Sequence, residues 1–464
     1  MKPKFYPEDT IAAIATPPGR GAIGVIKISG DQALSILEKI FQPKKPKPFL
    51  ESHRFHYGYI KDRESNEFID EVLVVYMKKP YSYTREDVVE IHAHSGFFNL
   101  KRVLELVLKE GARAAEPGEF TFRAFINGRI DLAQAEAIEE IVSAKSEISL
   151  NLAIKNLSGK LSEKINLLRE NLLSILAQVE AAIDFPEEDI EIMNPPELKR
   201  LLEENIDELN RLIENYREGK IYREGISLVI SGKPNVGKSS LMNILLKEER
   251  AIVTPIPGTT RDFLEEEVYI KGLPVKLIDT AGLRETEDLV EKMGVERAIE
   301  KLKEADLVLL LVDAGSKPTK EDTHIYNIIK PYNHLIVINK VDLSMNFLED
   351  WREFLKSLNE EFVEISVKEH QGIDLLTQRI FDKITHNGIP QVLEVVPNLR
   401  QKIALEKAKG HLLLALEELK KEEPLAEILA MELREAFSDL AEILGEVSTE
   451  DVLSDIFSRF CIGK

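Results

Sequence analysis

Hydrophobic residues in the first 120 positions of the chain follow two different spacings. Short apolar runs indicate strands, and apolar positions three and four apart indicate helices. The strands are expected at residues 22–28, 72–77 and 88–93, and the helices at residues 32–41 and 100–109. This mixture predicts an α+β domain over residues 1–120, in which helices and strands share one core.

A helical spacing then dominates from Leu132 to about Tyr216. Its apolar stripe consists of Leu150, Ile154, Leu157, Leu161, Ile165, Leu168, Leu172, Leu176, Val179 and Ile183. Asp184-Phe185-Pro186 and Asn194-Pro195-Pro196 should break this run into separate helices, because proline cannot continue a helix.

A second helical block runs from about Leu399 to Phe460. Its stripe consists of Leu429, Leu433, Ala436, Leu440 and Ile443. Since neither stripe has a partner inside its own block, we expect the two to bury each other. This predicts a helical domain built from residues 121–220 and 384–464, with residues 221–383 inserted as a domain whose ends lie close together.

The inserted segment begins with an apolar run at residues 226–230, followed by the glycine-rich stretch Gly232 to Ser240 and a helical pattern. A Gly-x4-Gly-Lys-Ser loop between a strand and a helix is typical of a phosphate-binding loop. Lys238 would reach the terminal phosphates, and Ser239 would offer its hydroxyl to Mg²⁺. The alternative is a glycine-rich turn without a ligand.

Three further polar segments follow predicted strands: Asp279 to Gly282, Asn339 to Asp342, and Ser366 to Lys368. The Asp342 carboxylate can accept two N–H bonds from guanine that adenine cannot supply, so we expect GTP rather than ATP. Polar segments at successive strand ends predict a doubly wound α/β sheet. The predicted nucleotide contacts are Asn235, Val236, Gly237, Lys238, Ser239, Ser240, Asp279, Thr280, Ala281, Gly282, Asn339, Lys340, Asp342, Ser366, Val367 and Lys368.

The groups that would activate water differ from those of Ras-like enzymes. Ras-like enzymes carry a glutamine directly after Asp-x-x-Gly, and here that position is Leu283, which cannot hydrogen-bond water. The acids in residues 284–291 are candidates for this role, although each could equally be a solvated charge. Thr260 can provide a second Mg²⁺ ligand, and Asn235 in the phosphate loop offers an amide oxygen as a ligand for a cation.

The formal net charge of −20 argues against a surface coated for nucleic acid, although a local RNA-facing patch stays open. No apolar run approaches membrane-spanning length, and a signal-peptide pattern is lacking. We therefore expect a soluble cytoplasmic protein with neither a membrane nor a DNA partner. The single cysteine, Cys461, allows no internal disulfide and agrees with a reducing compartment.

The chain resembles the MnmE (TrmE) family of tRNA modification GTPases. The resemblance rests on Ala-Thr-Pro-Pro-Gly-Arg-Gly at residues 15–21, Asp131 to Ile138, Gly-Thr-Thr-Arg-Asp at residues 258–262, and Cys-Ile-Gly-Lys at residues 461–464. It implies a multidomain fold: an α+β folate-binding-like N-terminal domain, a helical domain built from two chain segments, and an inserted Ras-like G domain.

The resemblance also implies a potassium-dependent GTPase that works as a homodimer, with two G domains approaching each other. K⁺ would be held by Asn235, by the main-chain oxygens of Thr254 and Ile256, and by Thr259, while Ser239 and Thr260 would bind Mg²⁺. The loop that encloses the cations and nucleotide is Thr254, Pro255, Ile256, Pro257, Gly258, Thr259 and Thr260. Glu291 would orient the attacking water. Lys238, at the terminal phosphates, and Arg261, which would aid ordering of the switch, are the further catalytic candidates.

In this family the N-terminal domain binds 5-formyltetrahydrofolate, which supplies a one-carbon unit. The matching positions are Lys27, Glu90, Arg129 and Lys464. At two of them the type is exchanged: Lys27 stands where the family has arginine, and Arg129 where it has lysine, which changes the hydrogen-bonding geometry. Cys461 could take part in the chemistry, or could be a buried structural thiol.

The partner implied is the FAD-dependent protein MnmG, in a heterotetramer or larger complex. Together they would convert the wobble uridine of certain tRNAs to aminomethyl or carboxymethylaminomethyl forms at C5. The competing hypothesis is a GTPase switch that binds RNA or assists ribosome assembly.

Overall fold

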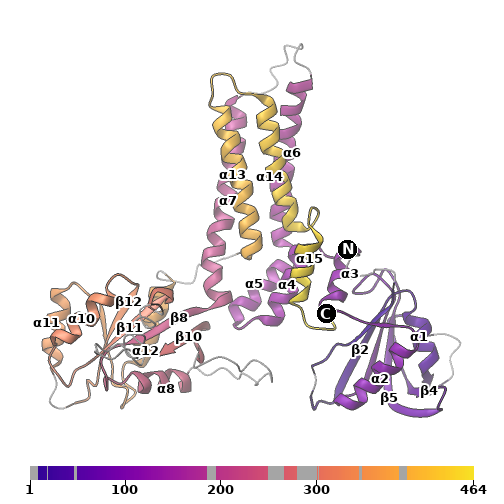
Figure 1. Cartoon of the computed structure of the whole chain (residues 1–464), viewed down its shortest axis with the longest axis horizontal. Helices are drawn as coiled ribbons and strands as arrows, with labels where there is room; N and C mark the ends of the chain where they lie inside the picture. The colour runs from indigo at the N-terminus through magenta and orange to yellow at the C-terminus, as the bar shows by residue number, and fades with distance from the viewer. Residues whose placement is uncertain are drawn as a thin grey trace, which may run out of the picture. The chain divides into compact units, whose positions relative to one another are not determined.

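The computed structural model describes residues 9–17, 19–45, 50–184, 195–248, 266–279, 300, 302–343, 347–385 and 394–464. Contacts divide the chain into two compact units. The first contains residues 1–143, 153–210 and 399–464, and the second contains residues 144–152 and 211–398. Mixed sheet and helical parts confirm the predicted multidomain fold class (Figure 1).

Within the described residues, the first unit contains a seven-stranded sheet in the order β3-β4-β5-β6-β2-β1-β7. Its strands are β1 (Ile11–Ile14), β2 (Ile23–Ser29), β3 (Phe41–Pro43), β4 (Phe55–Asp62), β5 (Glu67–Met77), β6 (Val88–His94) and β7 (Arg113–Ala114). Helices α1 (Ala33–Ile40) and α2 (Phe97–Lys109) pack on one face of this sheet, where Ile36 and Val103 share a core with Ile28 and Ile91. The expected strands and helices are thus present.

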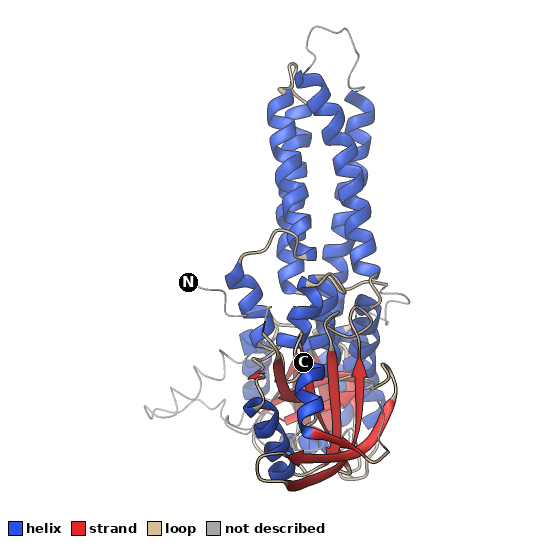
Figure 2. Ribbon diagram, turned by 90° about the vertical axis from the view of Figure 1, so that its right-hand side faces the viewer, coloured by secondary structure: helices blue, strands red, loops and turns tan. Residues whose placement is uncertain are grey.

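The two helical blocks pack together, as the unpartnered stripes predict. The helices are α3 (Glu119–Ile126), α4 (Leu132–Ser143), α5 (Glu147–Leu157), α6 (Lys160–Asp184), α7 (Pro195–Glu224), α13 (Leu399–Leu419), α14 (Ala426–Leu444) and α15 (Glu450–Ser458). Helix α14 runs beside both α6 and α13 (Figure 1), and Figure 2 shows the long helices side by side. An ion pair of 2.7 Å between Arg400 and Glu136 also joins the blocks. The predicted breaks at Asp184 and Pro195 are helix ends.

The predicted burial of one residue in the first apolar stripe, Ile154, is wrong. Ile154 is 47% exposed, whereas Leu152 and Ala153 beside it are buried. The stripe treated residues 150–183 as one helix, but α5 ends at Leu157 and Gly159 has a left-handed φ of +90°. This break changes the rotational phase, so the apolar face of α5 does not continue that of α6.

The second unit is a doubly wound α/β sheet. Its strands are β8 (Ile226–Ser231), β9 (Glu266–Ile270), β10 (Leu273–Asp279), β11 (Leu307–Asp313), β12 (His334–Asn339) and β13 (Phe362–Glu364). They lie in the order β13-β12-β11-β8-β10-β9, and all the pairs are parallel except β9 with β10. Helices α8 (Lys238–Glu248) and α12 (Ile373–Ile384) share one core with the sheet. Helices α10 (Lys320–Ile329) and α11 (Leu348–Ser357) share a second core with it.

The two chain segments that lead into and out of this sheet are held side by side. The Arg223 guanidinium donates to the carbonyls of Val396 and Pro397, both at 3.1 Å, and the Asn215 amide donates to Val395 at 3.0 Å. Gly219 leaves room for Val396, because a Cβ there would lie 2.2 Å from its Cγ1. The ends of the inserted segment are therefore adjacent, as predicted.

Candidate nucleotide and folate sites

The phosphate loop joins β8 to α8 at the point where the strand order of the sheet reverses. Strand β10 lies on one side of β8, and β11 lies on the other. Two of its glycines are required by close packing. Gly232 has φ +141°, and a Cβ there would lie 2.2 Å from the Leu311 carbonyl oxygen. Gly237 has φ +106°, and a Cβ there would lie 2.4 Å from the Asn339 amide nitrogen. The loop thus brings its backbone close to the strand ends beside it.

Lys238 spans the mouth of this loop. Its ammonium donates to the carbonyl oxygens of Gly232 at 2.7 Å and Lys233 at 2.8 Å. The next residue, Ser239, is exposed in the first turn of α8. A cation and a hydroxyl at a helix N-terminus suit a phosphate and its Mg²⁺.

The end of β12 is tied directly to the phosphate loop. Asn339 is buried, and its side-chain amide donates to the Val236 carbonyl at 2.8 Å while its oxygen accepts from the Val367 N–H at 3.1 Å. Lys340 donates to the Asn235 carbonyl at 2.8 Å and pairs with Asp313 at 2.6 Å. Three segments expected to contact nucleotide are therefore joined at one sheet edge.

Asp342 is oriented by Ser366, whose hydroxyl donates to a carboxylate oxygen at 2.6 Å. This hydrogen bond holds the pKa of Asp342 below its ordinary value. Lys368 is exposed and pairs with Glu369 at 3.5 Å. An ionised Asp342 is the form that accepts N–H bonds, as guanine recognition requires.

Two anchors of the phosphate loop were not expected from sequence. Asp313 binds Lys340, and its position at the end of the apolar run 307–312 was the available signal. Lys233 pairs with Asp322 at 2.6 Å. Asp322 forms a capping box with Thr319 at the start of α10, a pattern visible in sequence as Thr-x-x-Asp.

Several predicted site residues lie outside the described residues. These are Thr254, Pro255, Ile256, Pro257, Gly258, Thr259, Thr260, Arg261, Thr280, Ala281, Gly282 and Glu291. The strand β10 ends at Asp279, which is paired with Ile230 of β8. The described part of the chain holds no cluster of three or more His, Cys, Asp or Glu side chains suited to a metal.

The four positions expected to contact folate come together in the first unit. Lys27 and Glu90 are direct neighbours on β2 and β6. Lys27 and Arg129 lie over the ring of Tyr83, at 5.2 Å and 4.7 Å from its centroid. The Lys464 carbonyl oxygen accepts from the Phe120 N–H at 3.2 Å. Burial lowers the pKa of Lys27, Glu90 opposes this shift, and Lys464 adds to it.

The chain's last residues are fitted against β1. Gly463 has φ +92°, and a Cβ there would lie 2.8 Å from both the Ala15 Cα and the Ile14 carbonyl oxygen. Cys461 is a free, exposed cysteine, so the buried-thiol alternative is wrong. Sequence reasoning missed Tyr83 and Phe120, because no motif links them to residues so far away in the chain.

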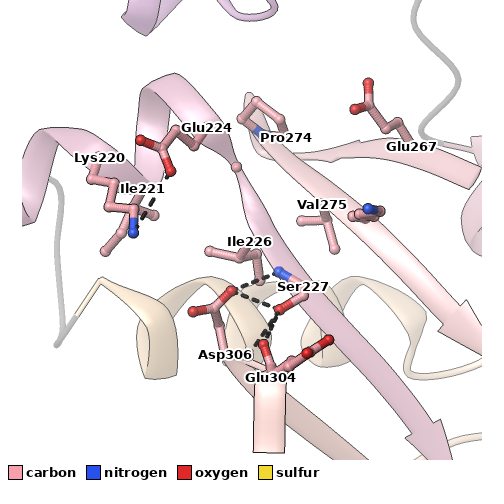
Figure 3. Close-up of a pocket in the computed structure, with 12 residues that line it drawn as sticks. Lys220, Ile221, Glu224, Ile226, Ser227, Glu267, Pro274, Val275, Glu304 and Asp306 are labelled. Carbon is pink, nitrogen blue, oxygen red and sulfur yellow. Dashed lines mark hydrogen bonds and ion pairs between the residues drawn. The ribbon is translucent and has the colours of Figure 1, made fainter. Parts of the chain in front are cut away.

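A separate pocket of about 350 Å³ lies at the opposite edge of the second unit's sheet, at the amino ends of β8 and β10. Figure 3 shows Asp306 beside Ser227 in its wall, where a carboxylate oxygen accepts from the Ser227 N–H at 2.7 Å and hydroxyl at 2.8 Å. The pocket is therefore distinct from the phosphate loop.

No described helix is both long and apolar enough to cross a membrane.

Comparisons with known proteins agree over nearly the whole chain. The profile of the GTP-binding protein TrmE N-terminus matches residues 10–129, and that of the MnmE helical domain matches residues 132–461. The tRNA modification GTPase MnmE of Desulforamulus reducens is 48% identical over 461 residues, which cover 98% of this chain and 100% of the relative. The tRNA modification GTPase MnmE of Aquifex aeolicus is 46% identical over 456 residues, which cover 98% of this chain and 100% of the relative. A solved structure of Aquifex aeolicus Era with GDP·AlF4⁻ is 31% identical, covers 43% of this chain and 69% of its own, and has a TM-score of 0.30.

Proposed function

The chain belongs to the MnmE family of tRNA modification GTPases, and we propose that it couples GTP hydrolysis to modification of the wobble uridine in certain tRNAs. The full-length likeness to MnmE relatives supports the tRNA part of this proposal. The link from Asn339 to both Val236 and Val367 is the observation that supports its GTPase part, because it joins the phosphate loop to the guanine-recognition segments. A single side chain thereby sets the distance between the phosphate and base subsites.

We also propose that the phosphate loop contributes to one K⁺ site and one Mg²⁺ site. Asn235 has φ +63°, its backbone carbonyl is held by Lys340, and its side chain is exposed. An amide oxygen at that position fits a K⁺ ligand, with Thr254, Ile256 and Thr259 completing the set. Mg²⁺ would be held by Ser239 and Thr260 and would neutralise charge on the phosphates. Glu291 would orient the water, because Leu283 cannot.

Binding of 5-formyltetrahydrofolate is proposed for the Lys27 site. Lys27 lies beside Glu90 and close enough to Lys464 to be repelled by it, and Arg129 shares the Tyr83 ring with Lys27, so three cationic side chains gather here. Such a cluster attracts anionic groups, and folates carry carboxylates. Cys461 is free, exposed and three residues before Lys464, so its thiol is our candidate for a group that acts on the one-carbon unit.

The open face of the first unit's sheet supports a homodimer. Phe55, Tyr57 and Leu73 point away from α1 and α2 and are 59%, 40% and 42% exposed. Tyr57 pairs with Leu73, and Leu73 pairs with His92, so these side chains form one row across β4, β5 and β6. Exposed apolar rows of this kind are typical of contact surfaces.

The modification reaction would require the FAD-dependent partner MnmG, in a heterotetramer or larger complex, and would place aminomethyl or carboxymethylaminomethyl groups on C5 of the uridine in the cytoplasm. The test is the nucleoside composition of tRNA from a strain lacking this chain, with the restored gene as control. Loss of the modified wobble uridine is expected. Unchanged nucleosides together with altered ribosome profiles would favour the RNA-binding or ribosome-assembly switch instead.

A further inference from the structure

Tyr83 lies between the main groups of the Lys27 site. The Lys27 ammonium is 5.2 Å from the Tyr83 ring centroid and 5.6 Å from that of Phe120, and the Arg129 guanidinium is 4.7 Å from the Tyr83 centroid. The Tyr83 hydroxyl shares a 2.9 Å hydrogen bond with the Thr121 hydroxyl. One ring therefore contacts two cations from distant parts of the chain, and its far end is fixed by a buried threonine.

Holding these cations together has an electrostatic cost. Lys27 is largely removed from water, and the nearby Lys464 repels it. Glu90, the neighbour of Lys27 on β6, is a single negative charge, and it is also 3.2 Å from the His92 ring nitrogen. An aromatic face attracts a nearby cation, and more strongly where water is excluded. The Tyr83 ring can therefore offset part of the repulsion without neutralising either charge.

We propose that Tyr83 is a positioning residue of this site, whose ring holds the Lys27 ammonium and the Arg129 guanidinium ready for the anionic groups of a reduced folate. The inference rests on the folate binding proposed above. A carboxylate side chain in place of the ring would pair with the cations and compete with the ligand. The aromatic ring keeps the cations in place and leaves their charge available.

The test is binding of 5-formyltetrahydrofolate to the full chain by calorimetry, from about pH 6 to about pH 10, a range that approaches the ordinary lysine pKa. The variants are Tyr83→Leu, which removes the ring, and Tyr83→Phe, which keeps the ring and removes the Thr121 bond. Tyr81→Leu is the matched control, since Tyr81 is 80% exposed. Thermal melting of each variant by circular dichroism checks the fold.

We expect Tyr83→Leu to weaken binding about tenfold, and Tyr83→Phe to stay within about threefold of the unaltered chain. The pH profile gives the sharper result. Affinity should fall as pH rises and Lys27 loses its proton. Without the ring the ammonium is less stabilised, so in Tyr83→Leu this fall should begin at lower pH.

Two results would overturn the inference while leaving folate binding intact. One is Tyr83→Leu binding as tightly as the unaltered chain at every pH. The other is an equal loss at every pH that Tyr83→Phe does not rescue, which would indicate a purely structural side chain. If the unaltered chain binds no folate, the proposed folate function fails as well, so the two failures are distinguishable.

Discussion

The Asn339 side-chain amide donates to the Val236 carbonyl at 2.8 Å, joining residues 103 positions apart in the chain. Its oxygen accepts from the Val367 N–H at 3.1 Å, so both ends of the amide are used. The phosphate loop and the segment that follows β13 are thus held by one buried side chain. The stability of the nucleotide site should depend on it more than on any surface ion pair.

Replacing Asn339 with alanine should weaken GDP binding about ten- to a hundredfold. The change leaves two backbone groups without partners, and each such group costs about 1–3 kcal/mol. A titration with fluorescent GDP measures the effect. Asn333→Ala is the matched control, because Asn333 is exposed and donates to the Asp306 carbonyl, at the opposite ends of the strands from the phosphate loop. Equal affinities for the two variants would contradict this role.

Replacing Asp342 with asparagine should change the base that the site prefers. The carboxylate accepts N–H bonds from guanine, whereas an amide can donate to the extra carbonyl of xanthine. We expect GDP affinity to fall on the order of 100-fold and xanthosine diphosphate to bind better than GDP. Competition binding with both nucleotides measures this, with Asp350→Asn as control because Asp350 pairs with Lys317 on the surface. A variant that still prefers guanine would show that another group reads the base.

Exchange of K⁺ for Na⁺ should slow GTP hydrolysis by about tenfold or more, because a missing cation removes charge stabilisation from the transition state. The exposed Asn235 side chain at the loop tip motivates this expectation. GDP affinity, measured in both salts, should change little. Asn235→Ala should make the rates in the two salts alike, and equal rates in the unaltered chain would remove the potassium claim.

Glu291→Ala should bind GTP normally and hydrolyse it about 100-fold more slowly, since Leu283 cannot orient water. Single-turnover hydrolysis separates the chemical step from product release. Glu287→Ala, an acid in the same segment, is the matched control. Should Glu287→Ala lose hydrolysis and Glu291→Ala retain it, the assignment of the water-orienting acid would move.

The polar segments that follow the strands of the second unit were predictable from sequence. Apolar runs mark buried parallel strands, and the carboxyl ends of parallel strands lie at the same side of a sheet. The contacts between those ends were not predictable. Lys340 reaches Asn235, and both residues adopt left-handed backbone, with φ values of +66° and +63°, a conformation that the apolar pattern does not predict. Likewise Tyr83 meets Lys27 and Arg129 through sheet register and the position of α3, which no local spacing encodes. The burial of Ile154 was mispredicted for a similar reason: the break at Gly159 changes the rotational phase between α5 and α6, and the apolar spacing does not reveal it.

The ion network around Asp9 should make the first unit sensitive to acid. Burial raises the pKa of Asp9, but hydrogen bonds from Arg113 and Arg123 outweigh it, so the pKa lies below the ordinary 3.8. Arg123 is almost completely buried and donates to Asp9 at 2.6 Å. Because the folded pKa is lowered, this stabilisation is fully present above the ordinary value and is lost as pH falls through the folded one.

Urea unfolding at neutral pH and at about pH 2.5, well below the ordinary pKa of 3.8, measures this loss, and Asp9→Asn should reduce the difference between the two pH values. The single tryptophan, Trp351, lies in the second unit, so its fluorescence serves as an internal control for far-UV circular dichroism. Asp31→Asn is the matched variant, since Asp31 forms an exposed pair with Lys79 at 2.8 Å. If Asp9→Asn and Asp31→Asn show the same pH dependence, the acid sensitivity originates outside the ion network around Asp9.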